Sequence, residues 1–174
     1  MRIGIDVSQI AYEKTGVSDY LKNLVQTLIR IDKKNEYVLF FSSLRRKLPE
    51  LLIDRSKVKI KKFRFPPLFL DLIWNKFHIL PIEKLIGNVD LFITSDWTEP
   101  PARAKKATIL YDLVIYKNPE ETAKKIVEVQ KRKLKWVKKE SDIIFCISES
   151  TKKDAANILG IEEKRLRVIY PGIN

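Results

Sequence analysis

The sequence predicts an α/β protein: a Rossmann-like three-layer domain built around a mainly parallel sheet. Short apolar runs alternate along the chain with segments of helical periodicity, which is the pattern of β-α-β units. Two of these runs, 89–93 and 107–110, break into polar residues at their carboxyl ends, at 94–97 and 111–112. Open α/β sheets place their sites just beyond such strand ends. The sequence therefore predicts a polar cleft at one edge of the sheet.

Length and composition narrow the class of protein. At 174 residues with 45% hydrophobic side chains, the chain fits one domain, or one lobe of something larger. The formal net charge of +12 favours an anionic partner, such as nucleic acid, an acidic membrane or a phosphorylated ligand. One cysteine excludes an internal disulfide, and one cysteine with one histidine provides too few ligands for a zinc site. The chain has neither a span-length apolar run nor a signal peptide, which predicts a soluble, cytoplasmic protein.

The first half of the chain shows the strand and helix alternation of a parallel sheet. The predicted elements are a strand at 2–7, a helix at 17–31, a strand at 36–42, a short helix at 48–53 and a strand at 58–65. In the last of these, basic residues alternate with apolar ones. A lysine-rich face is typical of an edge strand that is protected against further pairing. We favour this interpretation over a basic binding patch.

Residues 68–80, which follow two prolines, predict an amphipathic helix. Its apolar stripe would consist of Leu68, Phe69, Leu72, Ile73, Phe77 and Leu80, with Trp74 near the edge. A membrane-surface helix would carry several basic residues on its polar face, whereas this one offers only Asp71, Asn75 and Lys76. We therefore expect the stripe to pack into the core. His78 has no partner at metal-ligand spacing and is expected to be structural.

The predicted elements of the second half are strands at 89–93, 107–110, 143–147 and 168–170, and helices at 119–139 and 149–159. Asn118-Pro119-Glu120-Glu121 predicts a helix start, because it combines a cap, a first-turn proline and acidic residues. The helix that follows is rich in lysine, yet only Trp136 could stack on a base. A solvated basic face is therefore favoured over nucleic-acid binding, with contact to acidic lipid as a lesser option.

Four stretches share their order with a known family. They are MRIGIDVSQI with TGVSDYLKNLVQTL, VDLFITSDWTEPP, ATILYDLVIYKNPE and SDIIFCISESTKKDAANILGIEEKRLRVIYPGIN. Together they resemble the N-terminal domain of retaining glycosyltransferases of the GT-B fold, in glycosyltransferase family 4. The resemblance is weakest at 43–87, and Tyr111-Asp112 stands where the family usually has His-Asp. It implies that residues 1–170 form a Rossmann-like N-terminal domain, one half of a GT-B fold, and that residues 171–174 begin a hinge to a C-terminal domain absent from this sequence.

The resemblance also implies a reaction and a set of site residues. The reaction would move a hexose from a nucleoside diphosphate sugar to a glycan or lipid-linked acceptor, with retention at the anomeric carbon. It would need no bound metal and no cofactor. A C-terminal domain, in the same or a separate chain, would bind most of the donor, so the isolated chain is expected to be inactive. Asp112 and Tyr111 are the expected catalytic residues. The expected substrate-binding residues are Gly16, Tyr20, Asp96, Trp97, Ser148 and Ser150.

Blander interpretations of these residues and of the whole chain remain open. The alternative for Asp96 and Asp112 is a loop or helix-cap role, which fits Asp96 nearly as well as substrate binding, and the alternative for Ser148 and Ser150 is to cap their helix. The main alternative function is a non-catalytic, stand-alone domain that recruits a partner or an anionic surface. Peripheral contact with acidic lipid at the inner face of the membrane fits either function. Nucleic-acid binding rests on charge alone and is not favoured.

Overall fold

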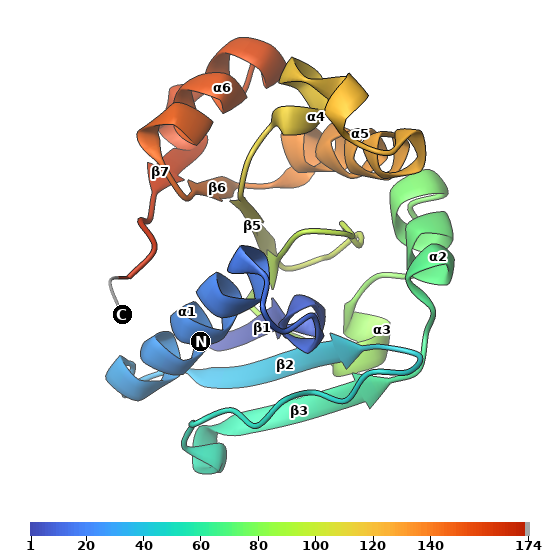
Figure 1. Ribbon diagram of the computed structural model, residues 1–174. Helices are drawn as coiled ribbons and strands as arrows, with labels where there is room; N and C mark the ends of the chain where they lie inside the picture. Colours follow the sequence, from blue (N-terminus) through green and yellow to red (C-terminus); the bar gives the residue numbers. More distant parts are fainter. Residues whose placement is uncertain (173–174) are drawn as a thin grey trace.

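The computed structural model describes residues 1–172 and contains one seven-stranded sheet with the order β3-β2-β1-β4-β5-β6-β7 (Figure 1). The strands are β1 (Arg2–Asp6), β2 (Glu36–Ser42), β3 (Val58–Phe63), β4 (Leu91–Thr94), β5 (Lys105–Leu110), β6 (Ile143–Cys146) and β7 (Leu166–Val168). All neighbouring strands pair in parallel. The predicted α/β class is confirmed. Ile173 and Asn174, part of the expected hinge, lie outside the described residues.

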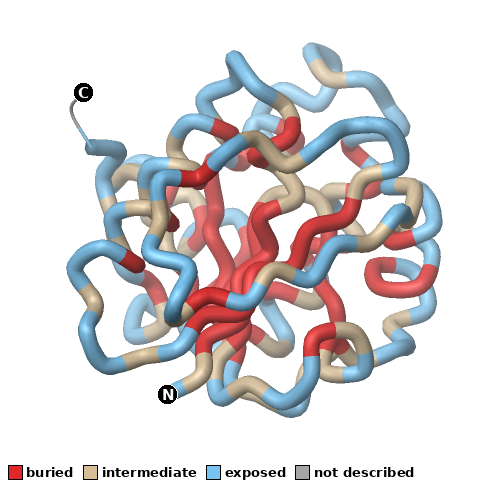
Figure 2. Tube along the Cα trace, turned by 90° about the horizontal axis from the view of Figure 1, so that it is seen from below, coloured by how far each residue is buried: buried red, intermediate tan, exposed pale blue. Residues whose placement is uncertain are grey.

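Helices cover both faces of the sheet, which confirms the three layers. The alternation of side chains along β2 sends Tyr37, Leu39 and Phe41 toward α1 (Gly16–Ile31) on one face. The opposite face packs against α2 (Pro67–Leu70), a π-helical turn (Asp71–Lys76), α3 (Glu83–Ile86), α5 (Lys124–Glu140) and α6 (Glu149–Leu159). Figure 2 shows the buried residues gathered along the strands in the middle of the molecule.

Helix α1 forms where the sequence predicts it. The side chain of Thr15 caps its first turn by accepting from the backbone N–H of Ser18 at 3.2 Å. Leu21, Val25 and Ile29 recur at helical spacing and are all buried against the sheet. The start of α1 is thereby fixed beside the carboxyl ends of the central strands.

The lysine-rich strand β3 lies at the edge of the sheet, as predicted. Lys59, Lys61 and Lys62 are exposed, while Val58 is buried beneath the segment that follows β2. An edge strand that presents charged side chains resists pairing with a second sheet.

The prediction of a short helix at 48–53 is wrong. This segment is irregular and extended, with Leu51 buried against the α1 layer and Leu52 exposed. Its backbone is held by the side chain of Gln26, which accepts from the N–H of Leu52 at 2.7 Å. Pro49 disfavours a helical conformation for the residue before it. The apolar run therefore forms no helix, and Leu51 packs against the α1 layer from an irregular segment.

The predicted helix start at Asn118 is also wrong. Pro119–Glu121 forms only a single 3-10 turn, and α5 begins at Lys124. The side chain of Asn118 donates to Glu121 at 3.1 Å instead of accepting from a backbone N–H. A short helix, α4 (Val114–Lys117), precedes the turn and was not predicted. Strand β7 begins two residues earlier than expected, because Leu166 and Val168 pair with β6.

The helix predicted at 68–80 forms only in part, and its buried face is the wrong one. It consists of the four-residue α2 and a π-helical turn, and it ends at Lys76. The buried side chains are Leu70, Ile73, Trp74 and Asn75, the last of which was expected on the polar face, whereas most of the expected stripe is exposed. Trp74 packs against Phe40 on β2, with ring centroids 5.5 Å apart. Within residues 1–172, no helix is long and apolar enough to cross a bilayer.

Candidate active-site cleft

Polar residues come together at the carboxyl ends of adjacent parallel strands, along one end of the sheet. Asp6 ends β1, Asp96 follows β4, and Tyr111-Asp112 follows β5. These strands are neighbours in the order β1-β4-β5, so their ends lie side by side. In open parallel sheets, ligands bind just beyond the carboxyl ends of the strands. The topology therefore brings these strand ends together where the sequence predicts a cleft.

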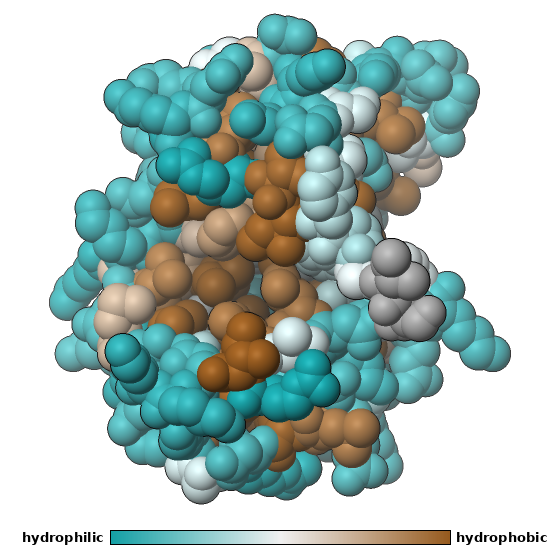
Figure 3. Space-filling view, turned by 90° about the vertical axis from the view of Figure 1, so that its left-hand side faces the viewer, coloured by the Kyte–Doolittle hydropathy of each residue, from teal (hydrophilic) through white to brown (hydrophobic). Residues whose placement is uncertain are grey.

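Three connected cavities lie at this end of the sheet. The largest, about 720 Å³, lies between α1 and the end of the described chain. A second cavity, about 310 Å³, shares Val17, Tyr111 and Asp112 with it. A third, about 340 Å³, shares Val17, Asp96 and Trp97 with the second. Figure 3 shows a hollow with a largely hydrophobic floor on the face beside the end of the chain.

Six of the eight predicted site residues line these cavities. Gly16, Tyr20, Tyr111 and Asp112 line the largest, and Asp96 and Trp97 line the other two. The exceptions are the two serines of α6. Ser148 caps α6 by accepting from the N–H of Thr151 at 3.0 Å, and Ser150 is exposed on the helix. Among the described residues, neither serine lines one of the three cavities.

Tyr111 forms the wall shared by two of the cavities. Its hydroxyl is hydrogen-bonded to Ser95 Oγ at 3.1 Å, and its ring meets Tyr20 edge-on at 5.6 Å between centroids. Burial raises the pKa of the Tyr111 phenol, so the group stays protonated. Tyr20 in turn donates to the carbonyl of Ile169 at 3.1 Å. The two tyrosines thus connect the strand ends, α1 and the segment after β7.

Asp112 is exposed and lies where the largest cavity meets the second one. Its Oδ1 accepts from the backbone N–H of Val114 at 3.1 Å, an Asx-type turn that fixes the carboxylate. The predicted cap role of Asp112 is therefore real, but it occupies only one carboxylate oxygen. Gly16 faces open space, since a Cβ there would meet no heavy atom within 4 Å. Nothing in the fold itself requires glycine at this position.

Lys133 is a site residue that the sequence analysis missed. It is buried on α5, and its ammonium group donates to the carbonyl of Ser95 under the second cavity. Burial lowers the pKa of the Lys133 ammonium. Burial also raises the pKa of the nearby Asp96 carboxyl, and the positive charge of Lys133 partly offsets that rise. Gln130 also donates to the carbonyl of Asp96 at 3.0 Å. One signal was available: Lys133 follows Gln130 by three residues and precedes Val137 by four, on the apolar side of α5.

A buried charge network lies beneath the cleft. Glu99 is fully buried and is paired with Lys106 at 2.9 Å. The hydroxyl of Thr94 donates to Glu99 at 2.6 Å, and Thr108 contacts it as well. Lys106 also reaches Glu140 at 3.0 Å. Because each charge has a partner, this network fixes the loop after β4 rather than offering a free binding group.

Asp6 gives a testable pH dependence. Its carboxylate is buried at the end of β1, and burial raises its pKa, so ionisation costs more in the folded than in the unfolded chain. The Asp6 carboxylate accepts a hydrogen bond from the N–H of Ser8 at 2.9 Å, and Asp6→Asn keeps an oxygen that can accept the same bond. We expect the variant to be more stable at pH 7 by roughly 0.5–2 kcal/mol. The gain should shrink as pH falls toward 4, because the wild-type carboxyl becomes protonated. Urea unfolding of both proteins between pH 7 and pH 4 measures the difference in the free energy of unfolding. A difference that grows on acidification would contradict the prediction.

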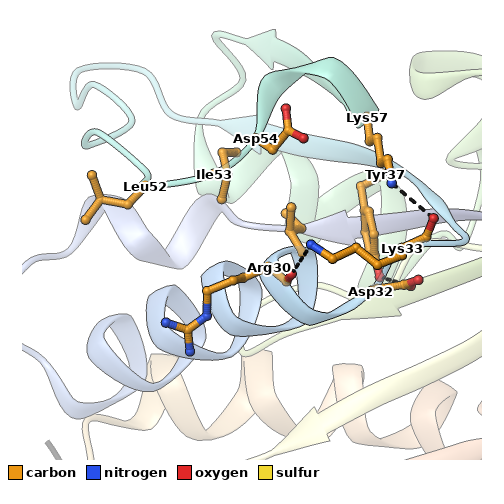
Figure 4. A pocket seen from close by; sticks show the side chains of 9 residues that line it. Arg30, Asp32, Lys33, Tyr37, Leu52, Ile53, Asp54 and Lys57 are labelled. Atoms are coloured by element: carbon orange, nitrogen blue, oxygen red, sulfur yellow. Dashed lines mark hydrogen bonds between the residues drawn. The ribbon is translucent and has the colours of Figure 1, made fainter.

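A separate cavity at the opposite edge of the sheet is structural. It holds about 160 Å³ and is lined by residues near the end of α1 (Figure 4). Asp32 accepts from Tyr37 at 2.5 Å and from Asn35 at 2.6 Å. Lys33 and Lys57 donate to backbone carbonyls, each at 3.0 Å. The polar groups of this cavity are hydrogen-bonded to one another and to backbone carbonyls near the end of α1. The strand-end cleft is therefore the candidate active site.

Comparison with known proteins agrees with the fold. The sequence model of the family described as Glycosyltransferase Family 4 matches residues 14–174. A solved structure of an alpha-glucosyltransferase in complex with UDP and a 13-mer DNA containing a HMU base is similar, with a TM-score of 0.50 and 14% identity over 99% of this chain and 43% of that chain. A second structure of an alpha-glucosyltransferase with UDP and such a DNA gives a TM-score of 0.47 at 15% identity, with the same coverage. No curated protein matches.

The parallel sheet with its strand-end cleft is the Rossmann-like half of a GT-B glycosyltransferase fold. The chain belongs to Glycosyltransferase Family 4, as the order of its motifs predicts. It spans less than half the length of the similar solved structure. Among residues 1–172, no cluster of three or more His, Cys, Asp and Glu side chains that could hold a metal ion occurs.

Proposed function

We propose that this chain is the acceptor-side domain of a retaining glycosyltransferase that moves a hexose from a nucleoside diphosphate sugar to a glycan or lipid-linked acceptor. The observation that carries the proposal is the continuous cleft at the strand ends, in a chain whose family match covers residues 14–174. The similar structure is an alpha-glucosyltransferase in complex with UDP, which supports a nucleoside diphosphate sugar as the donor.

Asp112 is the residue best placed to handle the acceptor. Its Oδ1 is engaged by Val114, and Oδ2 has the capacity to accept a hydrogen bond from an acceptor hydroxyl. A carboxylate in this position holds and orients the acceptor hydroxyl toward the anomeric carbon. For retention, the hydroxyl attacks from the face that the diphosphate leaves, and its proton passes to the departing phosphate oxygen. Tyr111 is bonded to Ser95 and shapes the wall that orients the sugar. Asp96, supported by Gln130, offers a second carboxylate deeper in the cleft.

The largest cavity explains why a second domain would be needed. Transfer leaves negative charge on the departing diphosphate, which requires cationic groups or helix N-termini. Among the described residues that line this cavity, the charged ones are Asp19 and Asp112, and no lysine or arginine is present. This wall is therefore suited to a neutral, hydroxyl-rich acceptor. The diphosphate would be held by the C-terminal domain, in the same or a separate chain.

We expect the 174-residue chain alone to show no sugar transfer and no tight binding of a nucleoside diphosphate sugar. The reason is the absence of cationic groups from the described lining of the main cleft. Release of nucleoside diphosphate from a panel of donors, together with calorimetric titration of UDP-glucose, tests this. Turnover by the purified chain without added protein would show that this domain holds its own donor site.

Asp112→Asn in the complete enzyme is expected to lower kcat/KM by about 10²-fold, because the amide replaces the free carboxylate oxygen that would hold and orient the acceptor hydroxyl. Asparagine retains the oxygen that Val114 uses, so the turn should persist. Asp54→Asn is a matched control, since Asp54 accepts from the N–H of Ser56 at 2.9 Å in the same i to i+2 geometry, at the other edge of the sheet. Equal kinetics for the two variants would remove Asp112 from the reaction and favour the non-catalytic binding domain.

A further inference from the structure

A group of large apolar side chains is exposed on the segment between β3 and α3. This group, the apolar collar, consists of Leu68, Phe69, Leu72, Phe77, Ile79 and Leu80, each between 37% and 58% exposed. Single exposed apolar residues are normal, but six of them within residues 68–80 point to a contact surface. In Figure 1 the segment lies at the right-hand edge of the molecule, beside α5.

The collar is held outward by a hydrogen-bonded turn. The indole of Trp74 donates to the carbonyl of Leu80 at 3.0 Å, and the N–H of Ile79 donates to the carbonyl of Ile73 at 2.9 Å. His78 and Leu80 adopt positive φ angles of 54° and 64°, which are unfavourable for residues with a Cβ. The fold thus tolerates backbone strain to keep these apolar side chains in solvent. A frayed helix end would show neither feature.

Cationic side chains surround the collar. The ammonium of Lys76 lies 5.6 Å from the ring centroid of Phe77. Lys135 and Lys139 lie over the ring of Trp136, which stacks on His78 at 3.6 Å between centroids. Lys125 lines a cavity together with Leu68. The rim of the collar is therefore positively charged.

Most acidic side chains near the collar have close cationic partners in the protein, whereas Glu128 is exposed and lies 3.9 Å from Arg132. Asp71 is the only acidic residue between Lys59 and Leu80, and it pairs with Arg132 at 2.6 Å. Glu140 is engaged by His78 at 2.9 Å and by Lys106 at 3.0 Å. Protein interfaces usually place both signs of charge around an apolar centre. A surface with apolar residues and a rim of one sign fits a bilayer with anionic headgroups better, and two copies of it would repel each other.

An apolar trough connects the collar with the strand-end cleft. A cavity of about 200 Å³ lies between α2 and α5, with Leu68, Ile126 and Val129 in its lining. It shares Trp97 and Thr98 with the cavity at the ends of β1 and β4. Trp97 therefore lies between an apolar opening at the surface and the polar cleft inside.

We propose that the apolar collar is a docking surface for anionic lipid bilayers. Its apolar side chains enter the interfacial region while Lys76, Lys135 and Lys139 meet the headgroups. Among the acceptors of the proposed function, this favours a lipid-linked one, whose sugar reaches the cleft while its chain lies along the trough past Trp97. That last step rests on the proposed glycosyl transfer, whereas bilayer docking does not.

Flotation of the 174-residue chain with vesicles tests the docking surface. Vesicles of phosphatidylcholine alone are compared with vesicles that contain 30% phosphatidylglycerol, at ~50 mM and ~500 mM salt, a range over which charge attraction is strongly screened. We expect binding to the anionic vesicles, weakened by salt, and at least tenfold weaker binding for Leu68→Ser/Phe77→Ser. The matched control, Ile31→Ser/Leu52→Ser, removes two apolar residues that are 65% and 81% exposed elsewhere and should change binding less than twofold.

A charge variant, Lys135→Glu/Lys139→Glu, provides a second arm should the collar variant fold poorly, as judged by thermal unfolding. It should abolish the preference for anionic vesicles. Absence of wild-type binding at low salt, or equal binding by collar and control variants, would overturn the proposal. Concentration-dependent dimers that the collar variant loses would instead identify a protein interface. If vesicles bind but the complete enzyme transfers no sugar, docking stands and the proposed function fails. If transfer to soluble glycans is unaffected by the collar variant, the lipid-linked acceptor is excluded.

Discussion

Lys106→Met is expected to lower the free energy of unfolding by about 3–5 kcal/mol, because it leaves a buried carboxylate without its cation. Lys106 is buried on β5, and its ammonium lies 2.9 Å from Glu99, which has no exposed surface. Methionine has a similar shape, so the loss should come from the unpaired charge and not from a cavity. Urea unfolding of the wild type and the variant at pH 7 measures the difference.

The neighbouring residue provides the control for this prediction. Lys105 is exposed and pairs with Asp142 at 3.1 Å on the surface, so Lys105→Met should cost no more than about 1 kcal/mol. The double variant Lys106→Met/Glu99→Gln should recover part of the loss, since the amide has no charge to compensate. Equal costs at positions 105 and 106, or no recovery in the double variant, would show that the buried pair does not stabilise the loop after β4.

Trp74→Ala is expected to cost about 3–5 kcal/mol, the range for removing a large aromatic side chain from a packed core. Trp74 is fully buried in the cluster that joins β2 to α2 and α3, where it contacts Phe40 and donates to the carbonyl of Leu80. Chemical denaturation monitored by circular dichroism gives the free energy, and the loss of vesicle binding should accompany it because the collar turn depends on the indole.

Phe77→Ala is the matched control, three residues away in the same segment. Phe77 is 57% exposed, so its removal should change stability by no more than about 0.5 kcal/mol while vesicle binding falls. A large loss of stability in Phe77→Ala would mean that the collar packs against the core, as the sequence pattern indicated. The pair of variants therefore separates the buried role of this segment from its surface role.

The strands and their order of appearance could be predicted because each apolar run is bounded by residues that do not continue it. Residues 36–42 form β2 with the predicted bounds, and the runs at 89–93 and 107–110 form β4 and β5 within two residues of them. A strand buried on both faces carries its own signal in a continuous apolar run. The positions of Asp96 and Asp112 followed from the same signal, since parallel strands end at one edge.

Helix boundaries and buried polar partners were less predictable, because they depend on contacts distant in sequence. Asn118 had the local features of a cap but bonded to Glu121 instead. Lys133 is one of many lysines on α5, and only its contact with Ser95, 38 residues earlier, makes it part of the site. Ser148 capped α6 as its sequence indicates, yet the described cavities lie elsewhere.

The sequence by itself determined a parallel α/β domain, the placement of polar residues at the ends of β4 and β5, and membership of a glycosyltransferase family. Only the tertiary structure decided which side of 68–80 faces the core. The segment has more apolar residues than one face of a short helix can bury, so several orientations satisfy the pattern equally well. The complementary surface formed by Val38, Phe40 and Phe92 admits Leu70, Ile73 and Trp74 and leaves the collar outside. Packing against a surface built from distant strands made that choice, and no local periodicity encodes it.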